Sequence, residues 1–397
     1  MSEAYIVAYG RSAAGKSKIG GAMFHERPDE VAAKVLKGVL ERVGGSFEPS
    51  MVDDVIVGNA FPEGLQGQNI ARVIALLAGM SEKVPGQTVN RYCSSGLQTI
   101  ALAANQIRAN QGDIIVAGGV ELMSAVPMGG NEPTNNPILQ DENLGVSYPM
   151  GLTAEMVAEK YNVSREDQDA YAVESHQRAY KAQSNGKFEK EIIPIEVSKV
   201  DYNEHGPIVT KNIFKDDELI RPNTNREVLA KLPTIFKSDG TVTAGSSAPL
   251  TDGAGFVVMM SEEKVKELGV TPIARFVGYK AVGVDPKVMG IGPAYAITEV
   301  LEQEKLKLED IDLIELNEAF ASQTLACIRE LKLNTDITNV NGGAIALGHP
   351  LGATGAMLVG RLLSEMEKRS STRYGMVTMC IGAGMGAAGI FEYIGKK

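Results

Sequence analysis

The sequence predicts an α/β protein made of two copies of one folding unit. Residues 52–61 and 311–320 share an acidic residue, an apolar strand pattern, and a closing Asn and Ala-Phe. Each of these segments follows a helical pattern that begins at a proline, over residues 28–43 in the first copy and 293–301 in the second. Alternating strands and helices of this kind predict mixed, largely parallel sheets with helices on both faces.

The two copies also correspond further along the chain. Residues 88–90 end a strand pattern before Cys93, and residues 339–341 end one before His349. Helical patterns then follow at residues 97–108 and 355–363, and strands at 113–120 and 374–393 complete the two copies. If the copies pack by pseudo-twofold symmetry, the two helix N-termini meet. We therefore expect Cys93 and His349 to lie together although they are far apart in the sequence.

The middle of the chain does not follow this repeat. It contains a stretch rich in Pro, Asn and Gly at residues 127–149 and a charged helical pattern at 153–184. We interpret it as an inserted cap that contributes substrate contacts. The predicted domains are an N-terminal half (1–120), an inserted loop domain (121–271) and a C-terminal half (272–397).

Composition limits the classes of function. A chain of 397 residues that is 44% hydrophobic can bury large cores, and its net charge of −10 argues against nucleic-acid binding. We expect no signal peptide, because residues 1–5 show no basic segment followed by an apolar one. We expect no membrane span, because the most apolar stretch, residues 376–391, is rich in glycine. Three cysteines without a Cys-x-x-Cys pair predict reduced thiols in the cytoplasm and no metal site.

Cys93 is the strongest candidate for a nucleophile. It lies where a strand pattern gives way to a helix, so its thiol faces unpaired N–H groups and the positive end of the helix dipole, which favour the thiolate. The alternative is a small buried cysteine. Three other segments favour the catalytic interpretation: His349 in Gly-His-Pro, Cys380 before a glycine-rich turn, and Asn317 in Asn-Glu-Ala-Phe.

Several other residues are consistent with structural positions that involve no catalysis. Asn317 is equally consistent with a helix cap and with catalysis. Cys327 is predicted to lie in the core, His176 in an exposed segment, and His25 and His205 in polar loops.

Two further segments point to ligand binding. Residues 384–389 match the dinucleotide fingerprint Gly-x-Gly-x-x-Gly, but they lead into a strand pattern where that fingerprint requires a helix. We therefore expect these glycines to bring backbone N–H groups to a reacting carbonyl. A basic run with cations Arg221, Arg226, Lys231 and Lys237 offers an acidic protein a place to bind an anionic ligand.

Over essentially its whole length the chain resembles the thiolases. The resemblance is carried in order by residues 90–98, 118–124, 150–155, 240–245, 317–320, 341–355 and 380–389. It implies a duplicated, five-layered α/β/α/β/α core with an inserted loop domain. It also implies a homodimer or homotetramer that takes coenzyme A (CoA) and acyl-CoA as substrates, with no metal and no resident cofactor.

The resemblance also implies roles for individual residues. Cys93 would form the acyl-enzyme thioester after His349 takes its proton, and Cys380 would be the acid and base for the acetyl methyl group. Asn317 would orient a water in one oxyanion hole, and the N–H groups of Cys93 and Gly382 would form the other. The residues implied for CoA and substrate binding are Arg221, Ser247, Met150, Met289 and Phe320. The chain departs from the family pattern at Ala248, where relatives usually have a serine that contacts the pantetheine arm of CoA. We therefore expect no such contact at this position.

The expected reaction is CoA-dependent cleavage of 3-ketoacyl-CoA in fatty-acid β-oxidation. Asn90-Arg91-Tyr92-Cys93 resembles the degradative enzymes more than the biosynthetic acetyl-CoA acetyltransferases, which are the first alternative. Ketoacyl synthases are disfavoured because they do not carry a cysteine at the position of Cys380. A non-catalytic acyl-CoA or lipid carrier and a thiol redox sensor remain as alternatives of another class, and a β-oxidation complex remains an open partner.

Overall fold

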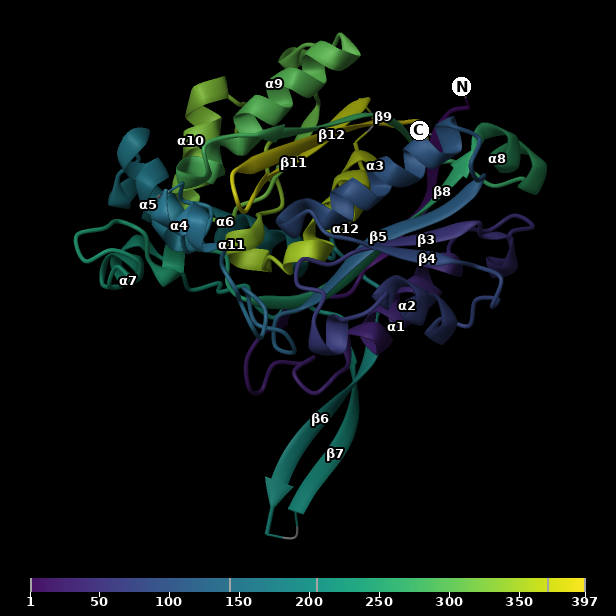
Figure 1. Cartoon of the computed structure of the whole chain (residues 1–397), viewed down its shortest axis with the longest axis horizontal. Helices are drawn as coiled ribbons and strands as arrows, with labels where there is room; N and C mark the ends of the chain where they lie inside the picture. Colours follow the sequence, from purple (N-terminus) through teal and green to yellow (C-terminus); the bar gives the residue numbers. More distant parts are fainter. Residues whose placement is uncertain (1, 143, 205, 370, 396–397) are drawn as a thin grey trace.

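The computed structural model describes residues 2–142, 144–204, 206–369 and 371–395, which form five alternating layers of helices and strands (Figure 1). The strands of the first sheet are β1 (Ala4–Arg11), β2 (Gly15–Lys16), β3 (Asp54–Gly58), β4 (Gly86–Val89), β5 (Ile114–Leu122) and β8 (Thr251–Ser261). Those of the second are β9 (Ala274–Gly283), β10 (Leu313–Leu316), β11 (Tyr374–Ile381) and β12 (Met385–Tyr393). The five-layered α/β fold is therefore confirmed.

Helices cover both faces of each sheet. The outer layers are α1 (Pro28–Leu40) and α2 (Ile70–Leu77) on the first sheet, and α9 (Gly292–Glu304) and α10 (Ala321–Leu331) on the second. The central layer is α3 (Ser95–Arg108) and α12 (Leu351–Met366). Three hydrophobic cores fill the spaces between these layers, as expected for amphipathic elements stacked on one another.

The expectation of largely parallel sheets was wrong. Among the ladders between described strands, only β3–β4, β3–β5 and β10–β11 are parallel, whereas β8, β1, β9 and β12 pair antiparallel with their neighbours. Parallel pairs form where a helix crosses over between two strands, but β11 and β12 are joined by a tight turn, which reverses the chain. Because β1 pairs with both β8 and β9, the first and second sheets are the two parts of one continuous sheet of ten described strands.

The hydrogen bonds of the repeated acidic residue confirm the duplication. The Asp53 carboxylate accepts the N–H of Ile114 (2.9 Å), and the Asp312 carboxylate accepts the N–H of Tyr374 (2.9 Å). Each acid thus ties the start of β3 or β10 to the start of the neighbouring strand. The strand registers also show that the closing asparagines are offset by one position, so that Gly58 takes the place of Asn317.

The N-termini of α3 and α12 pack directly against each other. A Cβ atom added at Gly96 would lie 2.8 Å from the carbonyl oxygen of Gly352, and one added at Gly355 would lie 2.2 Å from the backbone nitrogen of Leu97. Only glycine allows so close a contact between the two helices. The predicted meeting of the two helix N-termini is confirmed.

The remaining elements lie around this core. They are α4 (Pro137–Asp141), α5 (Met150–Lys160), α6 (Arg165–Ser184), β6 (Ile195–Asn203), β7 (Gly206–Phe214), α7 (Arg226–Ala230), α8 (Glu262–Leu268) and α11 (Ala344–Leu347). Strands β6 and β7 form a hairpin that projects from the body of the molecule (Figure 1). Strand β8 falls within the predicted insertion, 121–271, yet it pairs with β1 and β5 in the first sheet. No helix in the described ranges has the length and apolarity needed to cross a bilayer.

Candidate active site

A cavity of about 420 Å³ lies at the paired N-termini of α3 and α12. Cys93, His349 and Cys380 all line it, so the structure brings together three side chains from distant parts of the chain. The predicted binding residues that also line it are Arg221, Ser247, Met150, Met289 and Phe320.

Cys93 is held in a short 3₁₀ turn, Tyr92–Ser94, that leads directly into α3. Tyr92 has a φ of +43°, which is a strained conformation for a residue with a side chain. The Ser95 hydroxyl donates to the carbonyl of Tyr92 (2.6 Å) and accepts the N–H of Arg91 (2.9 Å). These contacts hold the turn in the geometry that presents the thiol to the cavity.

The resting state of Cys93 differs from the thiolate that the sequence suggested. Burial raises the pKa of its thiol to about 11, although backbone N–H groups of Gly382 and of Cys93 itself act in the opposite direction. The helix N-terminus was expected to favour the thiolate, but desolvation in the apolar cavity outweighs it. The thiol is therefore neutral near pH 7 and needs a base to become a nucleophile.

His349 is positioned to be that base. It follows Gly348, whose φ is +89°, and its backbone N–H donates to the Thr251 hydroxyl (3.0 Å). Burial lowers the pKa of the His349 imidazole to about 4, so the ring is neutral near pH 7. A neutral imidazole in the same cavity as a neutral thiol can accept the proton of that thiol.

The neighbours of His349 select one tautomer of its ring. The amide Nδ2 of Asn317 lies 3.3 Å from Nε2, and because an amide nitrogen can only donate, Nε2 is the acceptor. Nδ1 then carries the proton and donates to the Thr354 hydroxyl, 2.6 Å away. Asn317 is buried and does not cap α10, which has Phe320 at its cap position. The structure therefore favours the catalytic interpretation of Asn317 that the sequence had left open.

Cys380 and Gly382 approach Cys93 from the second sheet. Cys380 lies near the end of β11 and is buried, and burial followed by repulsion from Cys93 raises the pKa of its thiol well above the usual range. The turn after β11 is tight, with φ values of +65° at Ala383 and +83° at Gly384. It directs the backbone N–H of Gly382 at the Cys93 thiol, the place where an oxyanion would need a donor.

The predicted binding residues have different surroundings within the cavity. The Ser247 hydroxyl donates to the carbonyl of Thr243 (2.7 Å), and Ser247 pairs with Phe320 in an isolated β-bridge. Met289 and Phe320 are buried beside Cys380, and Met150 packs against the same cluster at the start of α5. These side chains give the cavity its apolar wall.

The cations of the basic run lie at different sites in the structure. Arg221 lines the cavity, whereas Lys237 forms an ion pair with Glu159 (3.4 Å) and Arg226 lines a separate pocket. The prediction that His176 is exposed was wrong: it is buried on α6, and its Nδ1 accepts the N–H of Arg221 (3.2 Å).

The remaining predictions of this kind concern one cysteine and two histidines. Cys327 is buried in the core, as predicted. His25 is exposed in a loop, and His205 lies outside the described residues.

Two polar residues of the site were missed by the sequence analysis. Glu121 is fully buried, and its carboxylate accepts the N–H groups of Ala60 (2.7 Å) and Gly352 (2.9 Å), so that it ties the first folding unit to α12. Thr354 faces His349 from within α12. Glu121 directly follows strand residues 113–120, and Thr354 lies about one helical turn from His349; these spacings were the available signals.

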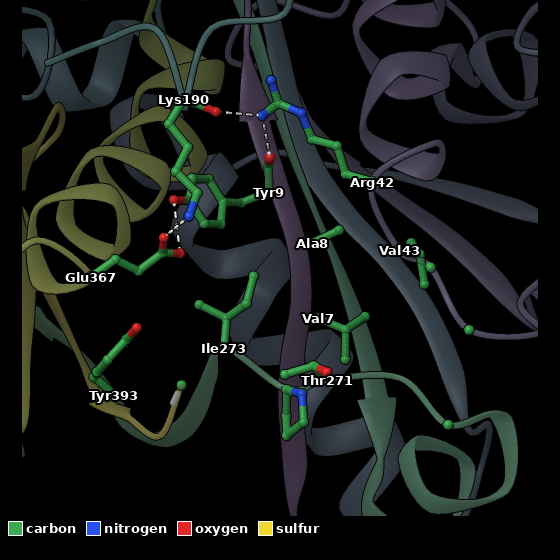
Figure 2. Close-up of a pocket in the computed structure, with 15 residues that line it drawn as sticks. Val7, Ala8, Tyr9, Arg42, Val43, Lys190, Thr271, Ile273, Glu367 and Tyr393 are labelled. Carbon is green, nitrogen blue, oxygen red and sulfur yellow. Dashed lines mark hydrogen bonds and ion pairs between the residues drawn. The ribbon is translucent and has the colours of Figure 1, made fainter. Parts of the chain in front are cut away.

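A larger cavity lies elsewhere in the described part of the chain. It has a volume of about 700 Å³ and lies beside β1, where Figure 2 shows its polar side chains directed at one another. Arg42 donates to the carbonyls of Tyr9 (3.0 Å) and Lys190 (2.7 Å), while the Tyr9 hydroxyl and Lys190 both bind Glu367. The described residues that line this cavity include neither cysteine nor histidine.

Comparisons with known proteins agree with this geometry. Residues 4–263 match the thiolase N-terminal domain and residues 270–393 the thiolase C-terminal domain. The chain is 50% identical to the 3-ketoacyl-CoA thiolase of Bacillus subtilis, with 99% of this chain and 100% of that protein covered. It is 43% identical to 3-ketoacyl-CoA thiolase A, peroxisomal, of Mus musculus, with 100% of this chain and 92% of that protein covered.

Solved structures show the same relationship. The crystal structure of the Bacillus anthracis acetyl-CoA acetyltransferase matches with a TM-score of 0.88 and 40% identity, and that of human mitochondrial 3-ketoacyl-CoA thiolase with 0.88 and 38%. In both comparisons 99% of each chain is covered. With both domains matched in order and Cys93, His349 and Cys380 in one cavity, this chain belongs to the thiolase family.

Proposed function

We propose that this protein catalyses the CoA-dependent cleavage of 3-ketoacyl-CoA into acetyl-CoA and a shortened acyl-CoA. The observation that carries the proposal is the convergence of a neutral thiol, a neutral imidazole and a second thiol in one largely apolar cavity. Relatives with 43–50% identity over nearly the whole chain are named 3-ketoacyl-CoA thiolases, which favours cleavage over acetoacetyl-CoA synthesis.

In the first half-reaction, His349 Nε2 takes the proton from Cys93, and the resulting thiolate attacks the keto carbon of the substrate. The bond between that carbon and the neighbouring methylene carbon then breaks, which leaves an acyl group on Cys93 and the enolate of acetyl-CoA. Cys380 donates its thiol proton to the enolate carbon, and acetyl-CoA leaves. The proposed oxyanion donors are the N–H groups of Cys93 and Gly382 at one oxygen, and Asn317 with a bound water and His349 at the other.

In the second half-reaction, the thiol of free CoA loses its proton to the Cys380 thiolate and attacks the acyl group on Cys93. The thioester bond to Cys93 breaks as the bond to CoA forms. The departing Cys93 thiolate regains its proton from His349, so the enzyme returns to its starting state. CoA is thus a substrate, and the mechanism uses no metal or resident cofactor.

The test is to mix the purified protein with CoA and with acetoacetyl-CoA or a long-chain 3-ketoacyl-CoA, and to measure acetyl-CoA formation. Cleavage of the long-chain substrate supports the degradative assignment. Efficient turnover of acetoacetyl-CoA alone would favour the acetyl-CoA acetyltransferase alternative. Binding of acyl-CoA without acyl transfer would indicate a carrier, and reversible oxidation of Cys93 without acyl transfer would indicate a redox sensor.

We also propose that the protein acts as a homo-oligomer in the cytoplasm. Strand β4 ends the sheet, and the neighbouring helix α2 exposes Leu76 (47%) and Leu77 (52%). Such an edge beside exposed leucines is suited to pairing with a second copy. The free thiols of Cys93, Cys327 and Cys380 fit a reducing compartment. Light scattering of the purified protein measures the mass, and a monomer would refute the oligomer.

A further inference from the structure

A second cavity, of about 380 Å³, adjoins the reaction cavity. The two cavities share Arg221, Pro249 and Leu250 in their walls, so they lie side by side. The second cavity is also lined by Lys16 and Lys18, which belong to the N-terminal folding unit and to no segment that the sequence analysis singled out.

The chain places these lysines beside the catalytic machinery by backbone pairing. In the β2–β8 ladder Lys16 is opposite Thr251, whose hydroxyl accepts the backbone N–H of His349 (3.0 Å). The N–H of Ser17 then donates to the carbonyl of Leu250 (3.3 Å). The position of the Lys16–Lys18 segment is therefore set by the same strand that supports the base.

The charge of this second cavity is positive in a protein with a net charge of −10. Its cations are Lys16, Lys18 and Arg221, and its acid is Glu218, whose carboxylate accepts the backbone N–H of Lys16 (2.8 Å). Within the described ranges, none of these three cations forms an ion pair. By contrast, Lys237 of the basic run is paired with Glu159.

The order of chemistry along the two cavities matches the order of groups along an acyl-CoA. The reactive thioester and its apolar neighbours suit the cavity around Cys93, and the phosphates of the nucleotide suit unpaired cations. We propose that Lys16 and Lys18, together with Arg221, bind the phosphate groups of CoA. This assignment rests on the proposed function and extends it to two residues outside the loop domain.

The first test compares two thiols as acceptors of the acyl group: CoA and pantetheine, which lacks the nucleotide phosphates. Lys16→Ala and Lys18→Ala should each raise the KM for CoA by roughly tenfold, as expected for loss of a charge-assisted contact, and leave the KM for pantetheine unchanged. Lys83→Ala is the matched control, because Lys83 is exposed and lines neither cavity. Added salt should weaken CoA use in the wild type more than in the double variant.

A second measurement does not depend on catalysis. Calorimetric titration with adenosine 3′,5′-bisphosphate, which carries phosphates but no thiol, should show binding to the wild type and loss of that binding in the Lys16→Ala/Lys18→Ala variant. An unchanged KM for CoA, an equal rise in KM for both thiols, or unchanged binding of the bisphosphate would each overturn the assignment. If the wild type binds the bisphosphate but cleaves no 3-ketoacyl-CoA, the proposed function fails while the phosphate site stands.

Discussion

The two folding units share a backbone but carry different side chains at equivalent positions. Cys93 precedes α3 by the same spacing as His349 precedes α12. Gly58 ends β3 where Asn317 follows β10, and a side chain at position 58 would collide with Ser95. In the second unit the same place is open toward His349, and Asn317 occupies it.

A third pair of positions follows the same rule. Counted from the residues bound by Asp53 and Asp312, Val120 on β5 is equivalent to Cys380 on β11. Val120 packs in the core, whereas Cys380 lines the cavity. The comparison teaches that the duplicated backbone supplies the geometry, and that the site arises where the two units meet and differ in their side chains.

The largest expected effect comes from removing the side chain that the first unit contributes. Cys93→Ala should lower the rate of 3-ketoacyl-CoA cleavage by about 10⁴-fold or more, because no other group replaces a covalent nucleophile. Incubation of the wild type with acetyl-CoA and mass analysis of its peptides should locate the acetyl group on Cys93. An acetyl group on Cys327 instead would contradict the assignment.

The Cys380→Ser variant distinguishes the role of Cys380 from that of Cys93. Acyl transfer to Cys93 should persist in this variant, while carbon–carbon cleavage falls by about 10³-fold, because a hydroxyl has a pKa too high to exchange the proton of the acetyl group. Exchange of the acetyl-CoA methyl hydrogens with heavy water reports this step directly. Exchange at the wild-type rate would show that Cys380 is structural.

The Asn317→Gly variant places in the second unit the glycine that occupies the equivalent position, Gly58, in the first unit. We expect a decrease in kcat of about 10²-fold, the typical loss for one group that supports an oxyanion, with little change in the KM for CoA. Thermal unfolding of the same variant controls for damage to the fold. A variant that folds normally and keeps wild-type kcat would remove Asn317 from the site.

Thr354→Val tests the second neighbour of the base. The valine keeps the shape but cannot accept the Nδ1–H of His349, so kcat should fall by about tenfold while Thr354→Ser stays near the wild type. Nitrogen NMR of labelled histidine distinguishes the two tautomers. An unchanged tautomer and rate in Thr354→Val would show that the Thr354 hydroxyl has no effect on the base.

The smallest effect concerns protonation of the resting enzyme. Since burial raises the pKa of Cys93 to about 11, its thiolate fraction should grow about tenfold for each pH unit below that value. Alkylation of Cys93 by iodoacetamide, measured in the Cys380→Ser background, should therefore accelerate steadily from about pH 6 to about pH 9. A rate that is constant over this range would instead indicate a thiolate–imidazolium pair.

The sequence predicted the duplicated fold and the meeting of Cys93 with His349, because repeated patterns and helix starts are local signals. Strand direction was not accessible, since alternation of apolar residues is the same in parallel and antiparallel strands. The protonation of Cys93 and the burial of His176 depend on what packs around them, which is contributed by distant segments. The approach of Lys16 to the site depends on its pairing with Thr251, which a local pattern does not encode.

The position of β1 between the two sheets affects how the chain can fold during synthesis. This strand is synthesised well before its partners, β8 and β9, which both lie beyond residue 250. Until β8 and β9 emerge, β1 has no partner strand, and contacts between such distant segments form slowly. The first sheet therefore stays incomplete until the residues beyond 250 have been synthesised, and its unpaired strand edges are exposed to aggregation until then.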